Sequence, residues 1–173
     1  VRLVRDGDQI IVPACAGEPP ALLAALSDMR RELSGVTVAQ VLAARSYGYL
    51  DPSTVDHVRH VAMFFGGATR PGGQQGWIDF IPGCFSEIPS MIRRGYIAAD
   101  VVFAMASPMD AEGNFSLSLG ADYTMAAIER ARAIVLEVNA NVPFAHGNCH
   151  VHVSRVSALV ERNDPVFEVG LAM

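Results

Sequence analysis

The sequence is poor in cysteine. Only 3 of its 173 residues are cysteines, Cys15, Cys84 and Cys149, and they form no CxxC pair. This number and spacing exclude a disulfide framework and are typical of reduced thiols. We therefore expect a cytoplasmic protein.

Long apolar runs and an excess of basic residues are also missing. No run approaches the roughly 20 residues of a transmembrane helix, and the opening VRLVRDGD lacks the profile of a signal peptide. The net charge is −5 and the pI is about 5.4, so there is no basic footprint for nucleic acid or an anionic membrane. We expect neither as a partner. The sequence does not open with Met, and we expect it to be a piece of a longer protein.

The composition is that of a folded domain. Hydrophobic residues make up 51% of the chain and charged residues 18%, which is enough to bury one sizeable core. Apolar strand patterns alternate with helical ones along the chain. We expect strands near residues 9–16, 36–43, 77–81, 98–107, 115–119 and 133–139, a buried strand that ends at residue 65, and helices near 18–33, 87–94 and 122–132. This order predicts a single α/β domain with an open, mostly parallel sheet between two helix layers.

The stretch from residue 63 to residue 95 carries the strongest signal of function. An apolar run ends at the pair Gly66 and Gly67, followed closely by Thr69 and Arg70. In open α/β sheets ligands bind beyond the carboxyl ends of the strands, so these four residues are candidate ligand contacts. The alternative is a tight connection beside a solvated arginine, because the sequence holds neither GxGxxG nor GxxxxGK[ST].

The order of motifs in this stretch resembles one protein family. FFGGATR at residues 64–70, followed by DFIPGCFSEIP at residues 79–89, is similar to the amino-terminal domain of the acetyl-CoA hydrolase/transferase family, which includes 4-hydroxybutyrate CoA-transferases. The similarity continues in GEP at residues 17–19 and in the pattern Ser-Pro-x-Asp that starts at Ser107. It extends over essentially the whole chain.

Three of these motifs also have a purely structural interpretation. Glu18 would complement the dipole at the start of a helix, and Ser86 would be a helix N-cap. Asp110 would close a turn through its side chain. These alternatives stand beside the functional ones.

The resemblance implies a CoA-transferase-like fold of the NagB/RpiA/CoA-transferase type. It implies a reaction between an acyl-CoA and a carboxylic acid, with the CoA thioester as substrate and no further cofactor. The nucleophilic glutamate is expected in a carboxyl-terminal domain outside this chain, and the enzyme is expected to be a homo-oligomer. Substrate or CoA contacts are expected at Gly17, Glu18, Pro19, Gly66, Gly67, Thr69, Arg70, Ser86, Glu87, Ser107 and Asp110.

Histidines supply a different hypothesis. His146, Cys149, His150 and His152 lie close together near the carboxyl end and have the ligand types of a soft metal site, although the spacing of known zinc motifs is missing. His57 and His60 are interpreted as surface or hydrogen-bonded interior side chains, because no acid or nucleophile is paired with them locally. A third hypothesis is a stand-alone module that binds CoA or a small acid without chemistry.

Overall fold

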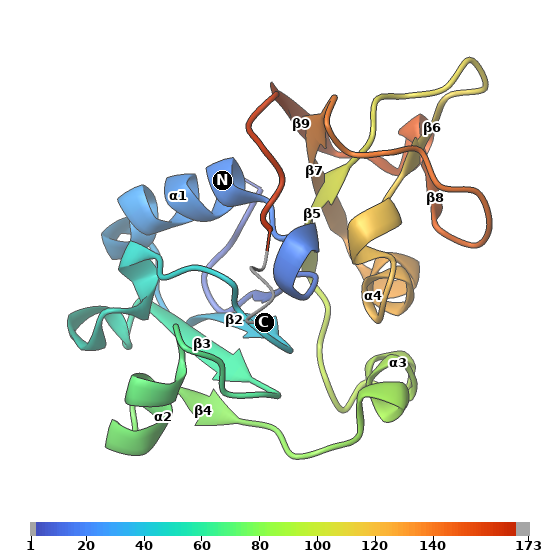
Figure 1. Cartoon of the computed structure of the whole chain (residues 1–173). Coiled ribbons are helices and arrows are strands. Elements are labelled where there is room, and N and C mark those ends of the chain that lie inside the picture. The colour runs from blue at the N-terminus through green and yellow to red at the C-terminus, as the bar shows by residue number, and fades with distance from the viewer. Residues whose placement is uncertain (1–2, 169–173) are drawn as a thin grey trace, which may run out of the picture.

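A seven-stranded parallel sheet forms the centre of the molecule (Figure 1). The structure, a computed structural model, describes residues 3–168. The sheet order is β4-β3-β2-β1-β5-β7-β9, and every neighbouring pair is parallel. Its strands are β1 (Gln9–Ile11), β2 (Val36–Gln40), β3 (Val58–Ala62), β4 (Asp79–Phe80), β5 (Val101–Ala106), β7 (Ala133–Asn139) and β9 (Ala158–Arg162). The predicted α/β class is confirmed.

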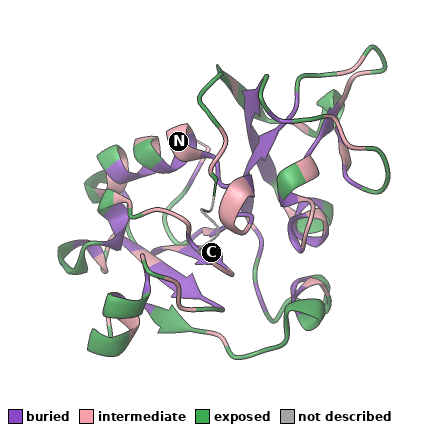
Figure 2. Cartoon of the chain, viewed as in Figure 1, coloured by how far each residue is buried: buried purple, intermediate pink, exposed green. Residues whose placement is uncertain are grey.

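Two pairs of helices cover the two faces of this sheet. Helices α1 (Pro20–Met29) and α2 (Arg70–Gln75) lie on the left in Figure 1, and α3 (Ile88–Arg93) and α4 (Thr124–Arg130) lie on the right. Strand β5 serves both cores, since Phe103 packs on the α1 side and Val102 on the side of α3 and α4. All residues of β5 and β7 are buried, as Figure 2 shows for the centre of the sheet. Their near-continuous apolar sequences are therefore those of strands covered on both faces.

Short elements complete the chain. A second, antiparallel sheet pairs β6 (Asn114–Ser116) with β8 (His150–His152). The 3-10 helices are η1 (Cys15–Gly17), η2 (Arg30–Glu32), η3 (Gly48–Leu50), η4 (Pro52–Thr54), η5 (Phe85–Glu87), η6 (Ser118–Gly120) and η7 (Val153–Arg155). No helix among residues 3–168 is long and apolar enough to cross a membrane.

Several predicted elements are longer than the observed ones. The strand predicted at 9–16 ends at Ile11, because Pro13 has no N–H to continue the ladder and η1 follows. The helix predicted to reach residue 33 leaves the α-helical path after Met29 and continues as η2. The strand predicted at 77–81 keeps only Asp79 and Phe80 as β4.

The strand order places a topological switch point beside β1. From this strand the chain builds outward through β2, β3 and β4 on one side, and through β5, β7 and β9 on the other. In such sheets the connections after the two central strands diverge, which opens a crevice beyond their carboxyl ends. The switch point here lies between β1 and β5.

Candidate functional site

The loops that carry the predicted contacts all leave the same edge of the sheet. Gly17 follows β1, Gly66 follows β3, Ser86 follows β4 and Ser107 follows β5. These strands belong to one parallel sheet, and β3 pairs directly with β4. The structure therefore gathers the four corners at the carboxyl edge. Whether they contact a ligand stays a prediction.

Glu18 is buried and ties the loop after β1 to the end of β2 and the loop that follows it. Its side chain is only 1% exposed. Oε1 accepts hydrogen bonds from Gln40 Nε2 at 2.9 Å and from the Ala44 backbone N–H at 2.7 Å, and Oε2 accepts one from the Tyr47 hydroxyl at 3.3 Å. Burial raises the pKa of Glu18 above its usual value, although these hydrogen bonds oppose the shift. The carboxyl group thus fastens the loop after β1 to the loop after β2.

The carboxylate at the start of α1 is Glu137, not Glu18. Glu137 lies in β7, and its Oε2 accepts the backbone N–H groups of Ala21 at 2.8 Å and Leu22 at 3.2 Å. The prediction that Glu18 complements the helix start is therefore wrong, and α1 has no acidic residue in its first turn. Burial raises the pKa of Glu137 as well. The sequence signal that could have identified Glu137 is its position as the one acidic residue in the apolar run AIVLEVN.

At the switch point the backbones of η1 and η6 meet with no side chain between them. A Cβ on Gly17 would lie 2.6 Å from the Cα atom of Gly120, so only glycine fits where η1 meets η6. Cys15 in η1 and Ser118 in η6 have positive φ values of 46° and 36°. Non-glycine residues with such backbone angles concentrate at functional sites. Sequence reasoning missed Gly120 and both strained residues.

Asp122 and Tyr123 fasten this corner from the start of α4. Asp122 Oδ2 accepts the backbone N–H of Ala14 at 3.2 Å, and burial raises the pKa of Asp122. The Tyr123 hydroxyl donates to the Val12 carbonyl and accepts the Val41 N–H at 3.1 Å. Together they hold the loops after β1 and β2 in fixed positions.

The corner from Gly66 to Arg70 is a packed turn. A Cβ on Gly66 would lie 2.4 Å from Leu42 Cδ1, and the Gly66 N–H donates to the buried Thr69 hydroxyl at 3.2 Å. Gly67 is exposed, with nothing within 4 Å of a Cβ placed there. Arg70 is exposed, and its Nη2 donates to the Phe65 carbonyl at 3.3 Å. The structural interpretation thus explains Gly66 and Thr69, while Gly67 and the Arg70 side chain face solvent.

Ser86 is not the N-cap that the sequence predicts. It lies inside η5 and is exposed, and the helix that follows begins at Ile88. The reciprocal bonds run between Cys84 and Glu87: the Glu87 N–H donates to the Cys84 carbonyl at 2.9 Å, and the Cys84 N–H donates to Glu87 Oε2 at 3.1 Å. The prediction fails because the chain enters α3 through a turn of 3-10 helix.

Ser107 and Asp110 shape the connection from β5 to β6. The buried Ser107 hydroxyl accepts the Ser116 N–H at 3.0 Å. Asp110 Oδ1 accepts the N–H groups of Glu112 at 2.9 Å and Asn114 at 2.7 Å, and the bond from Asn114 is the main reason that the pKa of Asp110 is lowered. The turn-closing interpretation of Asp110 is confirmed.

The proposed metal cluster is not assembled. His150 Nε2 bonds the Ala145 carbonyl at 2.9 Å, and His152 Nδ1 bonds the Ser154 hydroxyl at 2.8 Å. Cys149 is buried, with Sγ 3.3 Å from the Ala145 carbonyl. Within residues 3–168 no three His, Cys, Asp or Glu side chains are placed to hold a metal ion. The hypothesis built on His146, Cys149, His150 and His152 therefore loses its support.

His60 also differs from its interpretation. It is 2% exposed, and neither ring nitrogen has a hydrogen-bond partner. Burial lowers its pKa to about 4, so the ring is neutral near pH 7. His57, by contrast, bonds the Leu33 carbonyl through Nδ1 at 2.8 Å.

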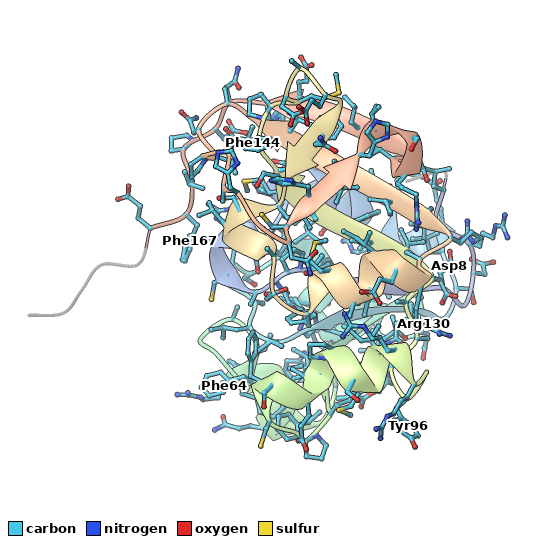
Figure 3. All side chains as sticks on the ribbon, turned by 90° about the vertical axis from the view of Figure 1, so that its right-hand side faces the viewer. Asp8, Phe64, Tyr96, Arg130, Phe144 and Phe167 are labelled. Carbon is cyan, nitrogen blue, oxygen red and sulfur yellow. The ribbon has the colours of Figure 1, made fainter. Side chains whose placement is uncertain are left out.

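A concave apolar surface of about 300 Å³ opens between two of the corners. We call it the apolar groove. It is lined by Val41, Leu42, Met63, Phe64, Gly83, Phe85 and Ile88. Phe64 and Phe85 are 57% and 54% exposed, and Figure 3 shows Phe64 on the side of the molecule away from Asp8 and Tyr96. The groove thus lies at the carboxyl edge, whereas Asp8 precedes β1 at the amino edge.

This arrangement defines a class: a doubly wound α/β domain whose shaped loops and open apolar surface meet at the carboxyl edge of a parallel sheet. The family model described as acetyl-CoA hydrolase/transferase N-terminal domain matches residues 1–169. The chain belongs to this family.

Known CoA-transferases are similar to the chain in sequence. It is 37% identical over 164 residues to the succinyl-CoA:cyclohexane-1-carboxylate CoA transferase of Geobacter metallireducens, a match that covers 95% of the chain and 37% of that protein. It is 30% identical to the 4-hydroxybutyrate coenzyme A transferase of Clostridium kluyveri, over 98% of the chain and 39% of that protein. The chain therefore spans less than two fifths of the length of these two relatives.

Solved structures agree with this assignment. RipA from Yersinia pestis has a TM-score of 0.88 and 28% identity, over 98% of the chain and 42% of that protein. The 4-hydroxybutyrate CoA-transferase of Porphyromonas gingivalis has a TM-score of 0.73 and 25% identity, over 97% of the chain and 38% of that protein. The predicted family is confirmed.

Proposed function

We propose that this chain forms one wall of the active-site cleft of an acyl-CoA:carboxylate CoA-transferase of the 4-hydroxybutyrate/acetate type, or of an acetyl-CoA hydrolase. The reacting glutamate comes from a carboxyl-terminal domain outside this chain. The observation that carries the proposal is the common edge at which the motif loops after β1, β3, β4 and β5 leave the sheet. The two sequence relatives from Geobacter metallireducens and Clostridium kluyveri, both CoA-transferases by name, support the reaction class.

The reaction proceeds by covalent catalysis at a carboxylate. The glutamate oxygen attacks the thioester carbonyl, the C–S bond breaks, and CoA leaves as a thiolate while an acyl-glutamyl anhydride forms. The thiolate then attacks the glutamyl carbonyl of the anhydride, which releases the first carboxylate and leaves a glutamyl-CoA thioester. An incoming carboxylate repeats these steps in reverse and leaves with CoA. In a hydrolase, water attacks instead and the free thiol is released.

The two glutamates of the motif loops, Glu18 and Glu87, are poorly suited to be that nucleophile. The Glu18 carboxyl group is buried and accepts three hydrogen bonds, so a thioester cannot approach it without breaking them. Glu87 is occupied by the Cys84 N–H. Both residues therefore stabilise the loops that form this side of the proposed cleft.

The other predicted contact residues of this chain are proposed to face the substrates. Gly17, Pro19, Gly67, Thr69, Arg70, Ser86, Ser107 and Asp110 line or support the loops that face the acyl-CoA and the carboxylic acid. Exposed Gly67 and Arg70 are the best placed for direct contact, since Arg70 can pair with an anionic group of CoA. Cys15, Cys84 and Cys149 are free thiols, which supports a cytoplasmic setting.

Complementation tests the proposal. The chain is mixed with a carboxyl-terminal domain of the same family, and transfer from acyl-CoA to acetate is measured. Each part alone is expected to be inactive and the mixture to turn over. CoA binding by this chain without any turnover in the mixture would instead support a stand-alone module that binds CoA or a small acid. We expect the active enzyme to be a homo-oligomer, which sedimentation of the mixture checks.

A further inference from the structure

The lining of the apolar groove is free of polar side chains. Six of its seven lining residues have apolar side chains, and the seventh is Gly83. Three of the six are Leu42, Met63 and Phe64. A charged group placed there would lose its water without gaining an ion pair or a hydrogen bond from a side chain. The groove therefore favours hydrocarbon over a carboxylate.

The walls of the groove are held in place before any ligand arrives. The Val41 N–H is fixed by the Tyr123 hydroxyl, and the Phe85 ring packs edge-on against the Tyr123 ring with centroids 6.0 Å apart. Leu42 occupies the space that a side chain at Gly66 would need. A preformed concave surface binds a ligand with less loss of conformational entropy than a mobile one.

The position of the groove relates it to the reaction. Val41 follows β2, Met63 follows β3, and Ile88 begins α3. The groove therefore lies at the edge where substrates of open α/β sheets sit. Its volume of about 300 Å³ is at the small end of ligand pockets and suits part of a ligand.

We propose that the apolar groove holds the hydrocarbon part of the acyl group, so that the enzyme prefers uncharged, apolar acyl-CoA substrates to dicarboxylic ones. This inference rests on the proposed function. It makes Phe64 a specificity-determining residue, because its exposed ring forms one side of the entrance.

Two thioesters of nearly equal shape test the preference in the complemented enzyme. 4-Methylpentanoyl-CoA carries an isopropyl group where succinyl-CoA carries a carboxylate. We expect kcat/KM to favour 4-methylpentanoyl-CoA by on the order of 100-fold. Phe64→Arg places a cation at the entrance and is expected to reduce this ratio at least about tenfold.

The matched control is Tyr96→Arg. Tyr96 is 75% exposed and lies on the side of the molecule away from Phe64 (Figure 3), so it receives the same charge without touching the groove. The acyl preference is expected to stay within about twofold of the unmodified enzyme. An unmodified enzyme that uses both thioesters equally, or an identical effect of the two substitutions, overturns the inference.

A binding measurement separates this inference from the proposed function. Met63 lines the groove, and a [methyl-13C]methionine label with Met63→Leu for assignment reports its occupancy in the chain itself. 4-Methylpentanoyl-CoA is expected to shift the Met63 signal and succinyl-CoA to leave it unchanged. Absence of transfer with every acyl-CoA contradicts the proposed function, whereas equal shifts, or no shift with either thioester, contradict the apolar groove as the acyl site.

Discussion

At the scale of single residues, the carboxyl edge depends on close backbone contacts and on buried polar side chains. Gly17 meets Gly120 across the switch point, and Glu18 binds donors from the loop after β2. Neither interaction involves residues that are neighbours in the sequence. The sequence predicted Gly17 and Glu18 as important positions through the family resemblance, but it could not predict their partners.

Gly17→Ala tests the backbone contact. The added Cβ would lie 2.6 Å from a backbone atom of Gly120, so one of the two loops has to move. Strain of this kind typically costs about 1–3 kcal/mol, and we expect a loss of that size in the free energy of unfolding, measured with urea. Gly67→Ala is the control, since nothing lies within 4 Å of its Cβ and it should be near neutral. Equal stability of the two variants would contradict the packing described for the switch point.

The burial of His60 leads to a prediction for how the free energy of unfolding changes at acidic pH. Its pKa is lowered from 6.5 to about 4 by burial, so below pH 6.5 the unfolded chain takes up a proton that the folded chain does not. The folded state therefore loses stability as the pH falls from 6.5 toward 4, by on the order of 3 kcal/mol from this residue. His60→Leu should remove this part of the pH dependence in urea titrations. If the free energy of unfolding of the variant depends on pH between 6.5 and 4 as strongly as that of the unmodified chain, His60 takes up its proton equally in the folded and the unfolded protein.

At the scale of elements, long apolar strands were predictable and short ones were not. β7 has the predicted bounds, because a strand buried on both faces leaves a continuous apolar pattern. β1 was predicted too long, since apolar residues after Ile11 are buried in a loop instead of a ladder. The predicted N-cap at Ser86 was wrong because the chain enters α3 through the 3-10 helix η5, and Ser86 lies inside that helix.

Glu137 connects strand β7 to the start of helix α1, and its ionisation gives a prediction for the pH dependence of stability. Burial raises its pKa above the usual glutamate value of 4.5. A raised pKa in the folded state means that the stability present below that usual value is lost as the pH rises through the folded pKa. Glu137→Gln keeps an oxygen for the N–H groups of α1 but cannot ionise. Its stability relative to the unmodified chain should therefore increase with pH in urea titrations from about pH 4 to pH 8.

Glu129→Gln is the control for this titration. Glu129 is exposed and pairs with Arg93 at 2.8 Å, and hydrogen bonds from that guanidinium lower the pKa of Glu129. A lowered pKa contributes stability that is present at high pH and lost as the pH falls. The stability of Glu129→Gln relative to the unmodified chain should therefore decrease as the pH rises toward 4.5, so its titration is extended below pH 4. If both variants change in the same direction, the carboxylate of Glu137 is not the buried acid described above.

At the scale of the whole molecule, the chain leaves surfaces that a further domain can cover. The edge strands β4 and β9 carry Phe80 and Leu159, which are 48% and 46% exposed. The motifs of the sequence were sufficient to predict the family and the edge at which its loops meet. The apolar groove was not predicted, because its walls come from three separate segments that only the folded sheet brings together.

The central claim is that this chain shapes the cleft and a neighbouring domain supplies the reactive carboxylate. Intact-mass spectrometry of the complemented enzyme, after incubation with acyl-CoA and rapid quenching, tests it most directly. We predict a CoA adduct on the carboxyl-terminal domain and an unmodified mass for this chain. A CoA thioester on one of the glutamates of this chain, or adduct formation by this chain in isolation, would contradict the account.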